Sequence, residues 1–288
     1  MSYALITDSS ADLPWSYYRE HDVPFIPLLV NFGENTYPDD GRVSSEEFFG
    51  RLSAGEVANT TQITQDRFFE FFEPFLQQGR DILYVGLTLG LSATYDSACL
   101  ARARLLEKYP ERRIELPEST CVSLGLGFLV DRLRRLRDGG ADIDALVEYT
   151  QRVKLKVHHR FTVDDLMFLH RGGRVSRTSA VVGSLLGIKP MLHVSPEGKL
   201  LNHGKVRGRR ASLLTLAADC IAMADRDELG TVAISHGNCK QDAEFVIEEI
   251  RKQLKIDEVI LHDLGCTIGA HAGNGTVALF FFGKERTE

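Results

Sequence analysis

The sequence predicts an α/β protein built from two α/β domains, at residues 1–155 and 156–288. Three observations lead to this class. Predicted strands alternate with predicted helices along the chain, which favours a largely parallel sheet. The chain has 288 residues, 43% of them hydrophobic, which is enough for one large or two medium cores. Near residues 150–160 a run of predicted helices gives way to a basic segment, and we place the boundary there.

The first half of the chain reads as strands and helices separated by turn residues. Asp12 is expected to cap a helix that begins at Pro14, and residues 59–62 are expected to form a loop. Predicted strands cover Tyr3–Thr7, Val23–Asn31, Asp81–Leu87 and Arg113–Leu116. Predicted helices begin at Ser44, cover Gln65–Gln77, run from Thr94 to about Lys108, continue from the turn at 119–127 through Arg137, and cover Ile143–Val153.

The second half opens with a basic element, residues 162–194. A helix ends at Gly172-Gly173, three arginines crowd this break, and a second helix follows, capped by Ser176 or Thr178. Its apolar face would be Val181, Val182, Leu185 and Leu186. Beyond it we expect a hairpin at Ile188–Val206, strands at Thr231–Ser235, Glu258–Asp263 and Thr276–Phe282, helices at Ala211–Arg226 and Gln241–Leu254, and a glycine-rich segment at Gly265–Gly275.

Composition excludes several classes of protein. The net charge of −6 argues against a protein that binds nucleic acid over a broad surface. There is no apolar run of 18 residues and no signal peptide at the N-terminus, so we expect no membrane span. The five cysteines are scattered without a CxxC pair, which favours reduced thiols in a cytoplasmic protein and disfavours a metal site. A transient contact with a membrane surface stays open.

Polar residues gather where predicted strands end. Ligands of open α/β sheets bind beyond the carboxyl ends of the strands, so these groups are candidates for a site. Ser92 lies at a strand-to-helix junction, where it either caps the helix, worth about 1 kcal/mol, or binds an anion with the free helix amides. Thr60 and Thr61 offer hydroxyl donors or simple loop caps, and His271 lies among glycines that allow close approach to a ligand.

An enzyme is the first alternative. Gly90-Leu91-Ser92-Ala93-Thr94 resembles the GxSxG elbow of serine hydrolases but has Thr94 in place of the last glycine. Ser92, Asp263 and His271 would keep the chain order Ser, Asp, His. No phosphate-binding loop or metal-binding motif is present in the sequence, so no cofactor is expected. A second alternative is an interaction module that uses the basic surface and has no ligand.

Six short motifs, in order along nearly the whole chain, resemble those of one family. They are Ile6–Pro14, Thr60–Gln62, Leu91–Ala98, Ser123–Gly127, Gly172–Ser176 and Ile268–Gly275. Together they are similar to the motifs of the DegV family, the fatty-acid-binding subunits of bacterial fatty acid kinase. The chain departs from the family pattern at Ala93, where Gly is usual, and at Asp96, where Gln is usual.

The resemblance implies two α/β domains with a lipid-binding cleft between them. A long-chain fatty acid would be buried there, with its carboxylate held by Ser92, by Thr60 or Thr61, and by His271. The register of the motif favours Thr60. The family has no catalytic site of its own and presents the acid to a separate kinase subunit related to dihydroxyacetone kinases, which forms the acyl-phosphate. Arg174 and Arg207 resemble the arginines that face this kinase.

Overall fold

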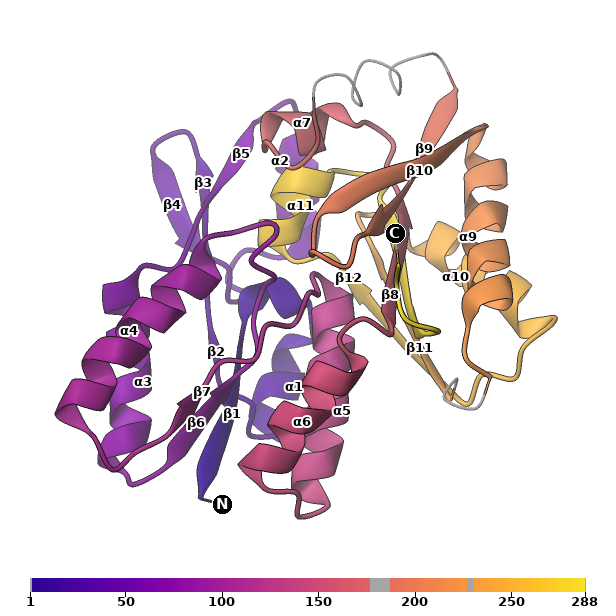
Figure 1. Ribbon diagram of the computed structural model, residues 1–288. Helices are drawn as coiled ribbons and strands as arrows, with labels where there is room; N and C mark the ends of the chain where they lie inside the picture. The colour runs from indigo at the N-terminus through magenta and orange to yellow at the C-terminus, as the bar shows by residue number, and fades with distance from the viewer. Residues whose placement is uncertain (1, 177–186, 227–229, 288) are drawn as a thin grey trace.

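The computed structural model describes residues 2–176, 187–226 and 230–287 and confirms an α/β fold (Figure 1). The strands form three sheets: a four-stranded sheet with the order β2-β1-β6-β7, a three-stranded sheet β4-β3-β5, and a six-stranded sheet β10-β9-β8-β13-β11-β12. The first two sheets use residues before 116 and the third uses residues after 156. The second helix expected in the basic element, at 178–186, lies outside the described residues.

The four-stranded sheet is parallel throughout, as the alternation of strands and helices predicts. Residues of β1 point alternately to two cores: Ala4 and Ile6 pack on one side, and Tyr3 and Leu5 on the other. Its strands are β1 (Tyr3–Asp8), β2 (Phe25–Ile26), β6 (Asp81–Tyr84) and β7 (Ile114–Glu115). The helices beside it are α1 (Trp15–Glu20), α3 (Gln65–Gln77), α4 (Thr94–Lys108), α5 (Leu124–Asp138) and α6 (Ile143–Val153).

The three-stranded antiparallel sheet was not expected. It contains β3 (Leu29–Phe32), β4 (Asn35–Pro38) and β5 (Ala58–Thr61), with α2 (Ser45–Ser53) beside it. The single strand predicted at Val23–Asn31 is therefore two strands in different sheets, because Pro27 interrupts the run. The loop predicted at 59–62 is mostly strand β5, whose polar sequence ANTT carries no hydrophobic alternation.

The six-stranded sheet is mainly antiparallel, which corrects the prediction of a largely parallel sheet for this half. Only β11 and β12 run parallel, because β13 inserts between β8 and β11 and runs antiparallel to both. The strands are β8 (Val157–Thr162), β9 (Ile188–Val194), β10 (Leu200–Arg207), β11 (Thr231–His236), β12 (Glu258–Asp263) and β13 (Val277–Phe282). Helices α9 (Arg209–Met223) and α10 (Lys240–Arg251) pack on its outer face.

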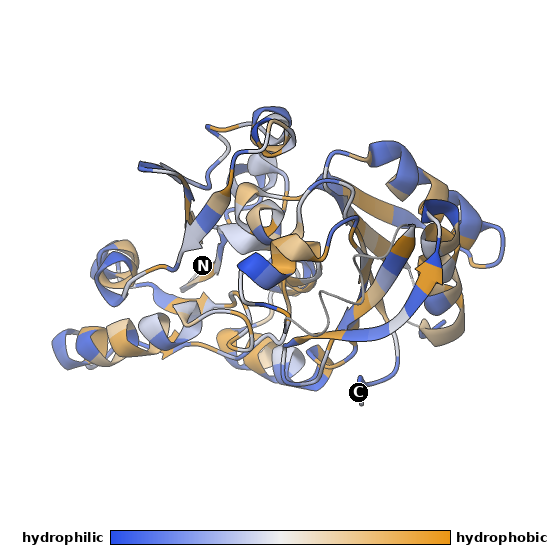
Figure 2. Cartoon of the chain, turned by 90° about the horizontal axis from the view of Figure 1, so that it is seen from above, coloured by the Kyte–Doolittle hydropathy of each residue, from blue (hydrophilic) through white to orange (hydrophobic). Residues whose placement is uncertain are grey.

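Two short helices join the halves. α7 (Met167–Arg171) contacts α11 (Cys266–Ala272), and α11 also packs on β3, β5 and α2. α11 forms within the segment that was expected to be only a glycine-rich connection. One apolar core joins residues of β1 and α5 to residues of β8 and β13, so hydrophobic contacts cross the boundary predicted after residue 155, which itself stays a prediction. Viewed from above, the peripheral helices show the mixed hydropathy of amphipathic helices (Figure 2).

Asp12 does not cap the helix that follows it. Helix α1 starts at Trp15 without a side-chain cap. The Asp12 carboxylate, almost fully buried, instead accepts hydrogen bonds from Ser123 Oγ at 2.5 Å and from the amide of Gly265 at 2.9 Å. Asp39 accepts two more, from the amides of Cys266 and Thr267 at 3.3 and 3.0 Å. Two acidic side chains from the first half therefore hold the N-terminal end of α11.

Candidate functional site

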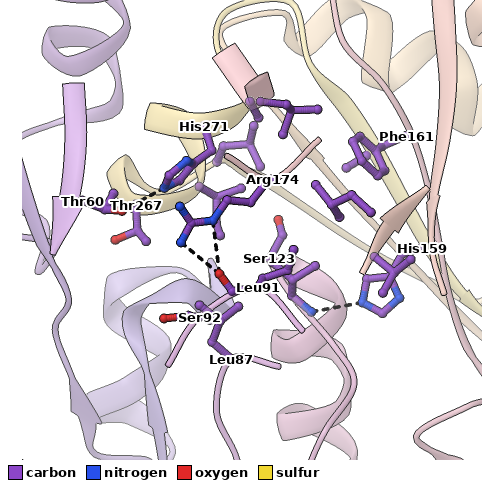
Figure 3. Close-up of a pocket in the computed structure, with 18 of the residues that line it drawn as sticks. Thr60, Leu87, Leu91, Ser92, Ser123, His159, Phe161, Arg174, Thr267 and His271 are labelled. Carbon is purple, nitrogen blue, oxygen red and sulfur yellow. Dashed lines mark hydrogen bonds between the residues drawn. The ribbon is translucent and has the colours of Figure 1, made fainter. Parts of the chain in front are cut away.

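A mostly apolar cavity lies where the loops after β2 and β6, strand β5, helix α11 and the inner face of the six-stranded sheet meet (Figure 3). Its volume is about 190 Å³, more than ten times the roughly 15 Å³ that one water needs. The lining residues are Leu28, Thr60, Gln62, Leu87, Leu91, Ser92, Ala93, Val122, Ser123, His159, Phe161, Leu169, Arg174, Val194, Leu200, Leu264, Thr267, Ile268, His271, Ala272, Thr276, Ala278 and Phe280.

Thr60 and His271 meet at one end of this cavity. Thr60 Oγ1 lies 2.8 Å from His271 Nε2, although the two residues are 211 positions apart in sequence. Thr60 comes from β5, and His271 from α11, which packs against that strand. Either atom can supply the proton, depending on the tautomer of the ring. The pair places one hydroxyl and one imidazole at the same point of the cavity wall (Figure 3).

Thr61 points the other way. Successive side chains of a strand face opposite sides, so Thr60 and Thr61 cannot both reach the cavity. Thr61 is exposed and its hydroxyl accepts a hydrogen bond from Asn31 Nδ2 at 2.9 Å. Between the two threonines left open by the sequence, the structure brings only Thr60 to His271.

Ser92 lines the cavity from the loop before α4. Its hydroxyl oxygen accepts a hydrogen bond from the Thr94 amide at 3.2 Å and lies 2.9 Å from Thr94 Oγ1. Ser92 is not the N-cap of α4, which is Ala93 and has no side-chain cap hydrogen bond. Ser92 lines the cavity one residue earlier, and its role as an anion site stays a prediction (Figure 3). Ala93 lines the cavity beside it, and Asp96 is exposed.

His271 is neutral at physiological pH. Burial lowers the pKa of its imidazole to about 4, and the positive charge of Arg174 acts in the same direction. Its Nδ1 atom is buried and has no hydrogen-bond partner among the described residues. Gly172 packs against this atom so closely that a methyl group at that position would stand 2.1 Å from it. A neutral imidazole suits a site that holds an anion through hydrogen bonds.

Arg174 also lines the cavity. Its guanidinium donates two hydrogen bonds to the carbonyl oxygen of Leu91, at 2.9 and 3.1 Å, and one to the carbonyl of Gly172. Arg174 and Leu91 line a surface groove next to the cavity as well. The side chain therefore stands between the interior and the outer face. Arg207 lies elsewhere, exposed on the edge strand β10 and outside the cavity lining.

The other end of the cavity is formed by the six-stranded sheet. Phe161, Val194, Ala278 and Phe280 contribute apolar side chains from three adjacent strands. Figure 3 shows Phe161 and His159 on the opposite side of the cavity from Thr60 and His271. Sequence reasoning did not identify these residues, because they come from three strands that only the order of the sheet brings together.

Ser123 is a further lining residue whose role the sequence did not show. Its backbone has φ 56° and ψ −152°, a combination that is favourable only for glycine. Its hydroxyl donates to Asp12, and the oxygen lies 3.2 Å from Ser235 Oγ. These bonds hold the strained residue at the start of α5. The small-residue motif Ser123–Gly127 was the available signal.

The geometry does not assemble the hydrolase triad. His271 Nε2 bonds to Thr60, while Asp263 Oδ1 lies 3.1 Å from His236 Nδ1. Ser92 has Thr94 as its partner. Each of the three side chains that would form the triad thus lies next to a different polar residue. Within the described chain, no group of three or more His, Cys, Asp or Glu side chains is arranged to hold a metal ion.

Comparison with known proteins identifies the family. The profile of the DegV family, described as uncharacterised proteins, matches residues 2–284. The chain belongs to the DegV family. A DegV domain-containing protein of Clostridium perfringens is 38% identical over 286 residues, which cover 99% of this chain and 98% of the relative.

Two solved DegV-like structures share the fold. The fatty acid binding DegV family protein of Streptococcus agalactiae is 29% identical with a TM-score of 0.84, covering 99% of this chain and all of that one. The Fatty Acid Kinase (Fak) B3 protein of Streptococcus pneumoniae, loaded with linoleic acid, has a TM-score of 0.87 and 21% identity, covering 98% and 99%. At 21% identity the second likeness concerns the fold alone. No helix of the described residues is long and apolar enough to cross a membrane.

Proposed function

We propose that this DegV protein binds a long-chain fatty acid in the cavity. The observation that carries the proposal is the polarity of the lining: Thr60, His271 and Arg174 lie at one end, and aromatic and aliphatic side chains together with the His159 ring form the other. This is the distribution that an acid with a long alkyl chain requires. Burial of each CH₂ group is worth roughly 0.8 kcal/mol, so the chain supplies most of the affinity and the polar groups orient the carboxylate.

The carboxylate would lie between Thr60, Ser92 and His271, close to Arg174. With the proton on Nε2, His271 donates to Thr60 Oγ1 and leaves the Thr60 hydroxyl free to donate to the carboxylate. Ser92 supplies a second hydroxyl donor, and Arg174 supplies a positive charge. The S. agalactiae relative, whose name states fatty acid binding, supports this assignment. An entirely apolar cavity without these four groups would favour a neutral ligand instead.

Thr60→Val and Ser92→Ala test the carboxylate site, with Thr61→Val as the matched control. Removal of a hydrogen bond to a charged group costs about 1.5–3 kcal/mol, so we expect each of the first two variants to weaken binding of palmitate about tenfold to a hundredfold. Thr61→Val should bind as the wild type does, because the Thr61 side chain is exposed and its hydroxyl bonds to Asn31 outside the cavity. Binding is measured by calorimetric titration of delipidated protein. Equal affinities of the Thr60 and Thr61 variants would contradict the assignment.

We propose further that the bound acid is presented to a separate kinase subunit, related to dihydroxyacetone kinases, that phosphorylates the carboxylate. The support is the resemblance of the sequence motifs and the fold shared with the S. pneumoniae Fatty Acid Kinase B3 protein. Arg174 lines both the cavity and the adjoining surface groove, and in this proposal it acts at the carboxylate during phosphoryl transfer. Arg207 is exposed on β10, and in this proposal it contacts only the kinase subunit.

Arg174→Ala and Arg207→Ala separate these two roles. We expect Arg174→Ala to weaken both palmitate binding and phosphoryl transfer in the reconstituted pair, because the guanidinium lines the cavity. Arg207→Ala should leave palmitate binding unchanged and raise the KM of the kinase for the loaded protein. The measurements are equilibrium binding and the rate of acyl-phosphate formation. If Arg174→Ala changes transfer alone, Arg174 belongs with Arg207 on the partner-facing surface.

A further inference from the structure

His159 and Val194 separate the cavity from a second hollow on the far side of the same wall. Both residues line both spaces, and each is only 1% exposed. They lie on adjacent antiparallel strands, and continuing the pairing of Arg160 with His193 by one residue sets them opposite each other. At this point the wall is one layer of side chains.

The His159 ring is held in place by the main chain. Its Nδ1 lies 3.0 Å from the carbonyl oxygen of Val157, which can only accept, so Nδ1 carries the proton. Its Nε2 then accepts the hydrogen bond from the amide of Val122 at 3.2 Å. Gly125 leaves room for the ring, since a methyl group there would stand 2.3 Å from Nε2. The ring is therefore a rigid part of the wall.

The two sides of this wall differ in chemistry. On the cavity side His159 and Val194 have Phe161 and Phe280 as neighbours in the lining. The second hollow is lined by charged side chains, among them Arg160 and Glu285, and by the apolar Ala222, Met223 and Ala224. With His159 and Val194 in place, an alkyl chain packed against the first surface cannot reach the apolar residues of the second hollow. The wall is thus where an alkyl chain has to end.

We propose that His159 and Val194 form the end stop that sets the longest acyl chain this protein accepts. The inference rests on the proposed function and adds a specificity determinant to it. Figure 3 places His159 across the cavity from Thr60 and His271, as the position opposite the carboxylate requires. The end stop is one layer of side chains between the cavity and the second hollow. A smaller residue at either position would connect the two spaces, and a larger one would shorten the cavity.

Changing Val194 in both directions tests the end stop without touching the bonds of His159. Delipidated wild type, Val194→Ala and Val194→Phe are titrated with laurate, palmitate, stearate, arachidate and behenate. For Val194→Ala we expect the ratio of the Kd for arachidate to that for palmitate to fall about tenfold, equivalent to about 1.4 kcal/mol. For Val194→Phe we expect the preferred acid to become shorter than in the wild type. His159→Ala should act like Val194→Ala where it folds.

Leu169→Ala is the control, because Leu169 lines the cavity on α7 and not the second hollow. It should lower affinity for every acid and leave the preferred length unchanged. An unchanged length preference in both Val194 variants overturns the end stop. A shift of the same size in Leu169→Ala also overturns it, since added volume alone would then explain the effect. Failure of the wild type to bind any of the acids refutes the proposed function instead.

Discussion

At the scale of single residues, the charge of His271 is determined by its surroundings. Its imidazole bonds to Thr60, its second nitrogen is buried against Gly172, and Arg174 lines the same cavity. Burial and the positive charge of Arg174 disfavour the protonated ring by lowering its pKa. The bound carboxylate would be the first negative group beside it. His271 is therefore a donor or acceptor of hydrogen bonds in the ligand-free protein and carries no charge.

The low pKa of His271 makes stability depend on pH. Its pKa is about 4 in the folded protein and 6.5 in the unfolded chain, so the unfolded chain takes up a proton first as the pH falls. The contribution of His271 to the free energy of unfolding is complete above pH 6.5. It is lost as the pH falls from 6.5 through 4, and the loss reaches up to about 3 kcal/mol. Burial likewise lowers the pKa of His158 and His193 to about 4, so they act in the same window.

His271→Gln isolates this contribution. Glutamine can keep a hydrogen bond to Thr60 and does not titrate, so we expect the free energy of unfolding of the ligand-free variant to fall less steeply between pH 6.5 and pH 4 than that of the wild type. Urea titrations at a series of pH values measure the difference. Burial raises the pKa values of three carboxyl groups, Asp8, Asp12 and Asp39, so their protonation increases stability as the pH falls. Both proteins contain these groups, and their effect therefore cancels in the comparison. If the free energies of unfolding of the two proteins change in parallel with pH, His271 is not buried as a neutral ring.

The residue types of the site were predictable from the sequence, but their pairing was not. Ser92, Thr60 and His271 were all candidates, and all three line one cavity. The choice between Thr60 and Thr61 needed the direction of strand β5, which a polar segment without hydrophobic alternation does not show. His159 could not be found, because a histidine in a buried strand is recognised as part of a ligand cavity only when the neighbouring strands are known.

At the scale of elements, α11 is the part of the fold that positions the site. It carries Thr267 and His271 into the cavity, and its first amides are bonded to Asp39 and Asp12 from the other half of the chain. Gly269 allows α11 to approach α2 closely, since a methyl group there would stand 2.7 Å from the Phe48 ring. The glycines of this segment led to the prediction of a connection without a helix. Gly269 is nevertheless part of α11, because the close packing it allows outweighs its low helix propensity.

Asp39→Ala and Asp40→Ala test the attachment of α11. Asp39 is 2% exposed, and its loss leaves two buried amides without their acceptor, so we expect destabilisation of about 2–4 kcal/mol together with weaker palmitate binding. Asp40 is paired with exposed Arg42, and its loss should cost less than about 1 kcal/mol. Urea unfolding and palmitate titration measure both effects. Similar stabilities of the two variants would show that the hydrogen bonds of Asp39 do not hold the helix.

Strong periodic patterns predicted their elements well. The helices at Gln65–Gln77 and Ile143–Val153 have the bounds expected from the spacing of their apolar residues, as does the strand at Glu258–Asp263. The three-stranded sheet was missed because its strands are short and half exposed. Local sequence signals a strand through alternation of hydrophobic and polar residues, and β5 has only one buried residue, Ala58.

At the scale of the whole molecule, the cavity results from how three sheets meet. The alternation of strands and helices correctly predicted the parallel sheet, whose helices connect consecutive strands. It did not predict the position of β13, which is the last strand in sequence and yet lies between β8 and β11. The pairing of β13 with β8 joins residues more than a hundred positions apart, and no local pattern specifies it. The apolar end of the cavity depends on this strand through Ala278 and Phe280.

The central claim is that the cavity holds a long-chain fatty acid. The most direct test is native mass spectrometry of the protein purified without detergent from a bacterial host, followed by identification of the released acid. We predict about one acid per chain, and none in a folded Ala278→Phe variant, in which the added ring occupies the cavity. Wild-type protein that is folded but carries no stoichiometric acid, and that binds none on addition, would contradict the account. An equal amount of acid on the Ala278→Phe variant would place the lipid somewhere other than this cavity.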